Sequence, residues 1–160
     1  MIIGVAVLLQ ASGQWVFELQ KRSKWVRTAA GETQIGLGCI GGSLETGESL
    51  VEALQREAWE EIGCQIKVNK SSISSPFLVH PDYTITEPHD GDRDAPVVFF
   101  WQANKPGYVQ GATVAVFSGT VQGTIQVGDL PGVLCMDTKT LLQLNQSRLT
   151  VGEIVQGGAR

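Results

Sequence analysis

The stretch from Gly42 to Cys64 constrains this chain more than any other part of its sequence. Ser49 and Glu52 have the spacing of a capping box, in which each side chain bonds to the backbone N–H of the other residue. Gly63 stands where a left-handed residue would end a helix. The sequence therefore predicts a helix from about residue 50 to residue 62, with a loop on each side.

The predicted helix gathers acidic groups beside an apolar stripe. At about 100° per residue, Glu57, Glu60 and Glu61 share an arc of roughly 100°. Carboxylates this close repel one another, and a divalent cation turns that repulsion into binding. Oxygen ligands suit Mg²⁺ or Mn²⁺. The adjoining face, which we expect to be buried, holds Val51, Leu54, Ala58 and Ile62.

The whole stretch has a longer pattern than this acidic face. From Gly42 it reads G-x5-E-x7-R-E-U-x-E-E-x-G-U, where U is an apolar residue. An isolated E-x-x-E-E would be a solvated helix face, but the agreement at every charged position and both glycines makes chance a poor explanation. The pattern resembles the Nudix box of hydrolases that cleave a nucleoside diphosphate linked to another moiety. The matching residues are Gly42, Glu48, Arg56, Glu57, Glu60, Glu61 and Gly63, with Ala58 and Cys64 at the apolar positions.

The resemblance implies a fold, a reaction and a cofactor. The implied fold is α/β, an α/β/α sandwich around a mixed β-sheet, with residues 1–160 as a single domain. The implied enzyme is a nucleoside diphosphate-X pyrophosphohydrolase in which Mg²⁺ or Mn²⁺ activates a water that attacks phosphorus. Arg56 would orient the carboxylates through an ion pair with Glu48 or Glu60. The implied metal-binding residues are Gly41 (through its carbonyl), Glu57, Glu60 and Glu61. The implied catalytic residues are Glu57, Glu61, Arg56 and Glu48. Glu57 is the first candidate for the general base, and an acidic residue from a loop is the second.

A basic run from residue 21 to residue 27 precedes the box. It offers Arg22 and Arg27 as phosphate-binding groups, although a solvated hairpin edge is the simpler interpretation. Gly42 is a further substrate-binding candidate, because a glycine lets the backbone approach a phosphate closely. Arg22-Ser23-x3-Arg27-x3-Gly31 resembles part of the element that marks coenzyme A-cleaving members, but the Phe-Pro that should precede the glycine pair is absent. Coenzyme A therefore stays one candidate beside ADP-ribose or nucleotide sugars, dinucleoside polyphosphates and oxidised nucleotides.

An acidic loop lies between residues 81 and 96. Loops in this part of Nudix folds supply a further metal ligand or base, so Glu87 or Asp90 is a candidate here, and Glu87 a candidate for contacting substrate. The spacing Asp90-x-Asp92-x-Asp94 suggests a calcium loop. The glycine is misplaced, however, and Trp101 occupies the position that requires a bidentate Glu, which favours a polar loop.

Two other motifs have simpler explanations. Gly36 to Gly41 forms G-x-G-x-x-G, but no helix follows it directly, so the dinucleotide-binding interpretation is rejected. The three cysteines are far apart and have neither zinc nor disulfide spacing, which favours a reducing cytoplasm. Cys39 has no favoured base beside it in sequence and is expected to pack as a small apolar residue. The apolar residues 2–9 are expected to form a buried strand, with no export and no membrane span.

The net charge of −4 argues against nucleic acid polymers and membranes as partners. The expected partner is a small nucleotide diphosphate derivative, and the resemblance also allows a homodimer. Two other classes of function stay open. One is a Nudix module that senses a nucleotide or nucleotide sugar without turnover, and the other is an interaction domain that uses residues 137–160.

The remaining elements are predicted as short strands and one further helix. Residues 2–9 and 15–19 should form a hairpin through the turn at 11–14. Asp137 is a possible N-cap for a helix at 138–144. The tail from residue 150 has a few apolar positions and is then expected to fray at residues 157–160. The other predicted strands lie at 35–40, 65–68, within 77–86, at 96–103, 113–123 and 132–136.

Overall fold

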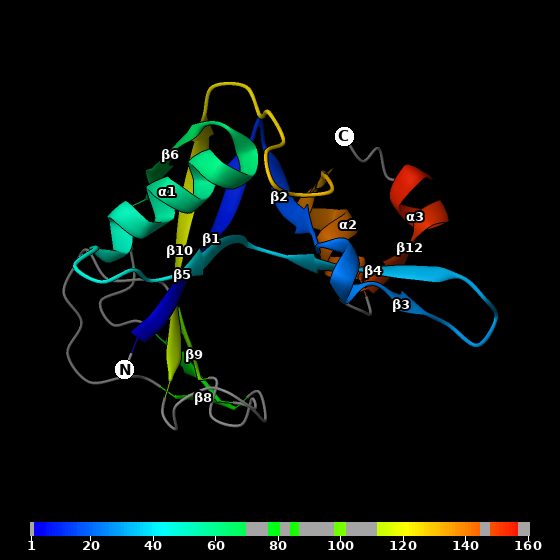
Figure 1. The fold of residues 1–160 in the computed structure, drawn as a ribbon, viewed down its shortest axis with the longest axis horizontal. Helices are drawn as coiled ribbons and strands as arrows, with labels where there is room; N and C mark the ends of the chain where they lie inside the picture. Colours follow the sequence, from blue (N-terminus) through cyan, green and yellow to red (C-terminus); the bar gives the residue numbers. More distant parts are fainter. Residues whose placement is uncertain are drawn as a thin grey trace.

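The computed structural model describes residues 2–69, 77–80, 84–86, 98–101, 112–144 and 148–156. They form a mixed β-sheet flanked by helices, which confirms the predicted fold class (Figure 1). The strands are β1 (Ile2–Ala11), β2 (Gln14–Leu19), β3 (Val26–Arg27), β4 (Thr33–Gly38), β5 (Ile40–Ser43), β6 (Gln65–Val68), β7 (Phe77–Val79), β8 (Ile85–Thr86), β9 (Val98–Trp101), β10 (Thr113–Gln122), β11 (Val133–Met136) and β12 (Arg148–Thr150). The helices are the 3₁₀ turn η1 (Arg22–Lys24), α1 (Leu50–Ile62), α2 (Thr138–Gln143) and α3 (Val151–Gln156).

Two long strands form the middle of the sheet. β1 and β10 run parallel, with Val5 opposite Ala115 and Val7 opposite Phe117. The main strand order is β12-β4-β2-β1-β10-β9-β7-β8. Beside this path, β5 pairs with β1, β6 with β10, β11 with β2 and β3 with β4. The predicted apolar strand at 96–103 is present as β9, between β10 and β7.

The hairpin of β1 and β2 forms as predicted, with Leu9 opposite Val16. Its two turn residues have positive φ angles, 50° at Ser12 and 78° at Gly13. This is the backbone that a two-residue hairpin needs, because its twist matches the twist of the strands. The hairpin places β2 alongside β4 and β11.

Helix α1 begins and ends where the sequence predicts. The Ser49 side chain accepts from the Glu52 N–H and the Glu52 carboxylate from the Ser49 N–H, which completes the capping box. Gly63 ends the helix in the left-handed region, with φ 63°. Loop residues after β10 then donate N–H groups to the last carbonyls of the helix, so these buried acceptors are satisfied. The donors are Gln126, Gly128 and Asp129, and the acceptors are the carbonyls of Ile62, Glu61 and Glu60.

The buried face of α1 agrees with the prediction at three of its four positions. Leu54, Ala58 and Ile62 are buried as expected, but Val51 in the first turn is 44% exposed. Ala53 is fully buried instead. Ala53 lies about 40° from Glu57 on the helical wheel, on the side away from Leu54. The acidic residues Glu57 and Glu61 therefore lie inside the buried arc rather than beside it.

The core has two parts. One holds α1 against β1, β5 and β6, with Val5, Val7, Ile40 and Ile66 beneath the helix. The other packs α2 and α3 against β2, β4 and β12, on the opposite side of the sheet from α1 in Figure 1. Sequence patterns do not indicate β12 or α3, where Ile154 is buried. Elements of three and six residues carry too little periodicity to be recognised, and they are stable only through tertiary packing. None of the helices in the described ranges combines the length and apolarity that crossing a bilayer requires.

The packing of α1 predicts unequal effects for two aliphatic positions. Leu54→Ala should lower the free energy of unfolding by about 2–5 kcal/mol, because it leaves a cavity under the helix. The matched control Val51→Ala should change it by about 1 kcal/mol or less, since Val51 is already 44% exposed. Urea denaturation followed by circular dichroism measures both values. Equal losses at the two positions would contradict the orientation described for α1.

Candidate functional site

A glycine pair on β5 lies directly against the acidic face of α1. A Cβ atom on Gly42 would overlap the carboxylate of Glu57, and one on Gly41 would overlap the carbonyl oxygen of Val5 on β1. Gly41 also has a φ angle of 152°, which side chains rarely allow. Only glycines therefore permit this contact between the strand and the helix.

The structure brings Glu57 and Glu61 together at the glycine pair. Glu61 is 8% exposed, and its Oε2 accepts a 3.2 Å hydrogen bond from the N–H of Gly41. The side chain of Glu57 is 13% exposed and lies against Gly42. Glu60 stays at the outer edge, with 49% of its side chain exposed. The three predicted carboxylates thus occupy different depths of one site.

Arg56 connects the acidic groups. Its Nε lies 2.8 Å from Oε1 of Glu48, and its Nη1 lies 2.8 Å from Oε1 of Glu57 and 3.6 Å from Oε2 of Glu60. Nη2 donates to the carbonyl of Ser43 at 3.0 Å. The ion pair predicted with Glu48 or Glu60 is therefore present with both, and it is shorter with Glu48. The hydrogen bond from Arg56 lowers the pKa of Glu48, and its carboxylate partners raise the pKa of Arg56.

Glu18 on β2 joins the site, although sequence reasoning did not single it out. Burial raises the pKa of Glu18, and its side chain is hydrogen-bonded to Glu61. Burial, followed by the negative charge of Glu18, raises the pKa of Glu61 to about 8. In this pair Glu61 holds a proton and donates it to the Glu18 carboxylate. The alternation of side chains along a strand could have indicated Glu18 from the sequence, since Glu18 shares a strand face with the buried Val16.

A cavity of about 410 Å³ opens beside the glycine pair. From the basic run, Lys24 contributes to its wall. Arg22 instead places its guanidinium 5.6 Å from the ring centre of Trp25, and Arg27 is exposed on β3. The predicted loop residues Glu87 and Asp90 lie outside the described residues. The residues that line the cavity are Ile3, Gly4, Val5, Ala6, Glu18, Lys24, Gly38, Cys39, Gly41, Gly42, Ser43 and Val114.

Cys39 lines this cavity as a neutral thiol. Burial, and then the charge of Glu18, raises its pKa to about 11. A thiol with this pKa is a poor nucleophile at neutral pH. This agrees with the expectation that Cys39 packs rather than reacts.

The donor chemistry of the site fits a hard divalent cation. Glu57 and Glu61 offer carboxylate oxygens at a backbone that glycines leave open, and oxygen ligands are those that Mg²⁺ and Mn²⁺ prefer. In the part of the chain that the structure describes, no three His, Cys, Asp or Glu side chains already stand at the spacing of a metal site. The carboxylates are instead engaged by Arg56 and by the Glu18–Glu61 hydrogen bond.

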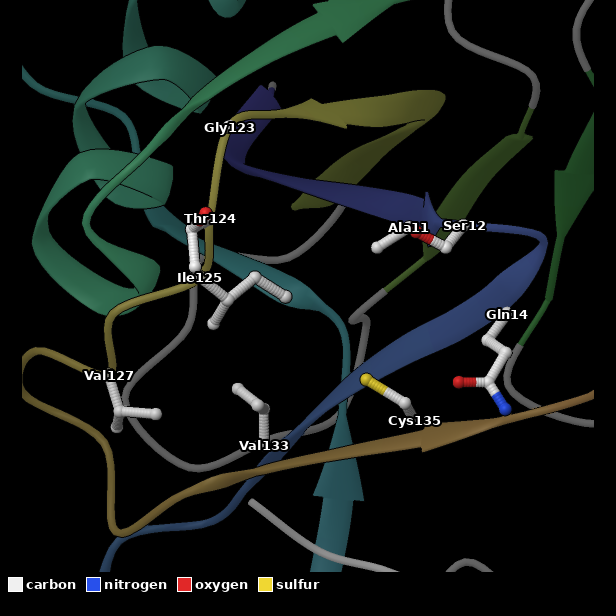
Figure 2. A pocket seen from close by; sticks show the side chains of 9 residues that line it. All are labelled: Ala11, Ser12, Gln14, Gly123, Thr124, Ile125, Val127, Val133 and Cys135. Atoms are coloured by element: carbon white, nitrogen blue, oxygen red, sulfur yellow. The ribbon is translucent and has the colours of Figure 1, made fainter.

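A second cavity, of about 310 Å³, lies at the opposite end of β1 (Figure 2). Ile125, Val127, Val133 and Cys135 form much of its wall, and Gln14 points along its edge. Its lining includes no charged side chain. This chemistry does not suit a polyphosphate, so the first cavity is the candidate site.

Comparison with known proteins identifies the family. The NUDIX domain model matches residues 2–121, and the chain therefore belongs to the Nudix family. The fold is similar to that of a NUDIX-family hydrolase from Clostridium perfringens, with 16% identity, a TM-score of 0.59, and coverage of 89% of this chain and 85% of that one. It is also similar to a MutT protein from Methanosarcina mazei Go1, with 18% identity, a TM-score of 0.52, and coverage of 91% and 83%.

A UDP-X diphosphatase is another structural neighbour. It shares 15% identity and a TM-score of 0.50, and the match covers 98% of this chain and 59% of that protein. The chain likewise spans 57% of the length of a NUDIX hydrolase from Nitrosomonas europaea. No curated protein sequence matches the chain significantly. Identities this low establish the fold, and the family is established by the domain match.

The acid pair predicts how the metal-free protein responds to pH. The pKa of Glu61 is about 8 in the folded protein, against an ordinary value of 4.5. Between these values the folded state binds more protons than the unfolded state, so rising pH favours unfolding. We expect the melting temperature in a chelator to fall as the pH rises from about 5 to about 8.

Glu61→Gln should remove most of this slope, because the amide does not ionise. Thermal unfolding across the pH series measures the change, and Glu32→Gln, at an exposed position away from the site, is the matched control. A slope that Glu61→Gln leaves unchanged would contradict the assignment of the proton to this pair.

Proposed function

We propose that this Nudix protein hydrolyses the diphosphate linkage of a nucleoside diphosphate joined to another moiety, with Mg²⁺ or Mn²⁺ as cofactor. The observation that carries the proposal is the pair of carboxylates, the buried Glu61 and the half-buried Glu57, held against Gly41 and Gly42. The domain match supports the reaction class. The UDP-X diphosphatase among the structural neighbours is compatible with this substrate class.

Each residue of the site has a distinct role in this proposal. Glu57, Glu61 and the Gly41 carbonyl would hold the cation, with Glu60 contributing from the outer edge. A bound Mg²⁺ or Mn²⁺ supplies neutralisation of the diphosphate charge and activation of the attacking water. Glu57 is the first candidate to accept the proton of that water at its carboxylate, and an acid from the loop at 81–96 is the second.

Arg56 and Glu48 position the carboxylates. Arg56 bonds Glu57 through Nη1 at 2.8 Å, and Glu48 holds the same guanidinium through Nε at 2.8 Å. An arginine fixed at two edges keeps its bonded carboxylate in one orientation. Arg56 is thus a positioning residue that acts through Glu57.

The cavity beside the glycine pair is the proposed substrate pocket. Gly42 allows close approach of a phosphate to the backbone, and Lys24 adds a positive charge to the lining of the cavity. The backbone of Lys24 is fixed, since Arg148 on β12 donates to its carbonyl at 3.2 Å. Arg22, Arg27 and Glu87 remain further candidates for contacting the part of the substrate that extends beyond this cavity.

The proposal treats residues 1–160 as one domain that acts in the cytoplasm, alone or as a homodimer. Support for one domain comes from β11 and β12, which pair with β2 and β4 of the matched region. The three cysteines, Cys39, Cys64 and Cys135, have neither zinc nor disulfide spacing in the sequence, which is compatible with a reducing compartment.

The reaction is tested with the purified protein and a substrate panel in Mg²⁺ and in Mn²⁺. The panel contains ADP-ribose, nucleotide sugars, dinucleoside polyphosphates, oxidised nucleotides and coenzyme A, and mass spectrometry identifies the products. Glu61→Gln should lower kcat by about 100-fold or more, because the cation contributes several kcal/mol to transition-state stabilisation. Binding of a panel member without any turnover would favour a sensing module instead, and an unchanged kcat in Glu61→Gln would contradict the site.

Lys24 is tested with the substrate that the panel identifies. Lys24→Ala should raise KM by about 10-fold with a smaller effect on kcat, since it removes one charged contact to phosphate. Lys67→Ala, at an exposed position on β6, is the matched control and should leave both constants unchanged. An unchanged KM in Lys24→Ala would exclude Lys24 from the phosphate contact.

A further inference from the structure

Glu18 enters the site from the sheet and faces α1. It stands on β2, where its backbone partner on β4 is Gly38. A Cβ on Gly38 would come within 2.5 Å of Glu18 Oε1. The side chain of Glu18 therefore lies across the space that a larger residue at position 38 would fill. This places its carboxylate in the wall of the cavity that also contains Gly41 and Gly42.

Glu18 meets Glu61 across this wall. The two carboxyl groups are hydrogen-bonded, although both are largely withdrawn from solvent. Two carboxylates in such contact need either a proton or a cation between them, because like charges at this distance repel strongly where the dielectric is low. In the metal-free chain, this contact keeps a proton.

Burial raises the pKa of Glu18, and two nearby lysines partly oppose this effect. Lys24, which lines the same cavity, lowers the pKa of Glu18, and Lys21 acts in the same direction. The Glu18 carboxylate lies near a glycine-lined opening and beside the proposed metal-binding residues. Carboxylate oxygens are ligands that hard cations prefer.

We propose that Glu18 is a further ligand of the divalent cation, contributed by the sheet and facing Glu61 and Glu57 on the helix. The inference rests on the proposed function. It differs from a purely structural role, in which Glu18 would only hold Glu61 in place. Glu18→Gln separates the two roles, because the amide oxygen can still accept the hydrogen bond from Glu61 while the ligand charge is lost.

The test measures Mn²⁺ binding to the nucleotide-free protein by electron paramagnetic resonance of free Mn²⁺. The protein and the variants Glu18→Gln, Glu61→Gln and Glu32→Gln are titrated under one set of conditions. We expect Glu18→Gln to raise the Kd for Mn²⁺ by about 10-fold or more, since a charged ligand is lost. Glu32→Gln, exposed and away from the site, should bind as the unmodified chain does.

The outcomes distinguish the two proposals. If the unmodified chain binds Mn²⁺, Glu61→Gln weakens binding and Glu18→Gln does not, the role of Glu18 is overturned while the proposed function stands. If the unmodified chain binds no Mn²⁺, both are overturned. Should Glu18→Gln fail to fold, Glu18→Asp serves in its place. It keeps the charge but withdraws the carboxylate by one methylene, so weaker Mn²⁺ binding supports the ligand role and unchanged binding overturns it.

Discussion

The close approach of α1 to the glycine pair on β5 is the contact on which the candidate site depends. Gly42 leaves room for the Glu57 carboxylate, and the N–H of Gly41 bonds to Glu61 at 3.2 Å. A side chain at Gly42 would displace the Glu57 carboxylate, and one at Gly41 would collide with the backbone of β1. The buried apolar face of α1 holds it in this position, since Leu54, Ala58 and Ile62 are all fully buried.

The electrostatics of the site follow from this packing. Helix burial withdraws Glu61 from water, and β2 adds Glu18 to the same space. Arg56 offsets the charge at the outer side through Glu48, Glu57 and Glu60, but its guanidinium reaches neither Glu18 nor Glu61 in the described contacts. Burial, and then the charge of Glu18, raises the pKa of Glu61 to about 8, so the inner pair keeps a proton at neutral pH. Such a pair is a natural place for a divalent cation, because the cation removes the cost of burying two carboxylates together.

Local sequence signals predicted the elements whose causes are themselves local. The capping box of Ser49 and Glu52 and the left-handed Gly63 set the ends of α1, and the turn at Ser12 and Gly13 set the first hairpin. The ion pair of Arg56 was also predictable, since its partners stand on the same helix and at its N-terminus. Short elements such as β12 and α3 were not, because their stability comes from packing against β4 rather than from their own periodicity.

The sequence by itself determined the family, the helix that carries the acidic residues, and the spacing of Glu57, Glu60 and Glu61, because these depend on helix geometry over a few turns. Only the tertiary structure decided that Glu57 and Glu61 face inward while Val51 faces solvent, since burial depends on where the helix lies on the sheet. It also decided that Glu18 and Lys24 border the candidate pocket. Glu18 on β2 and Lys24 on η1 line one cavity with the glycine pair on β5. Their separation along the chain does not predict this proximity, because it depends on how the strands pair.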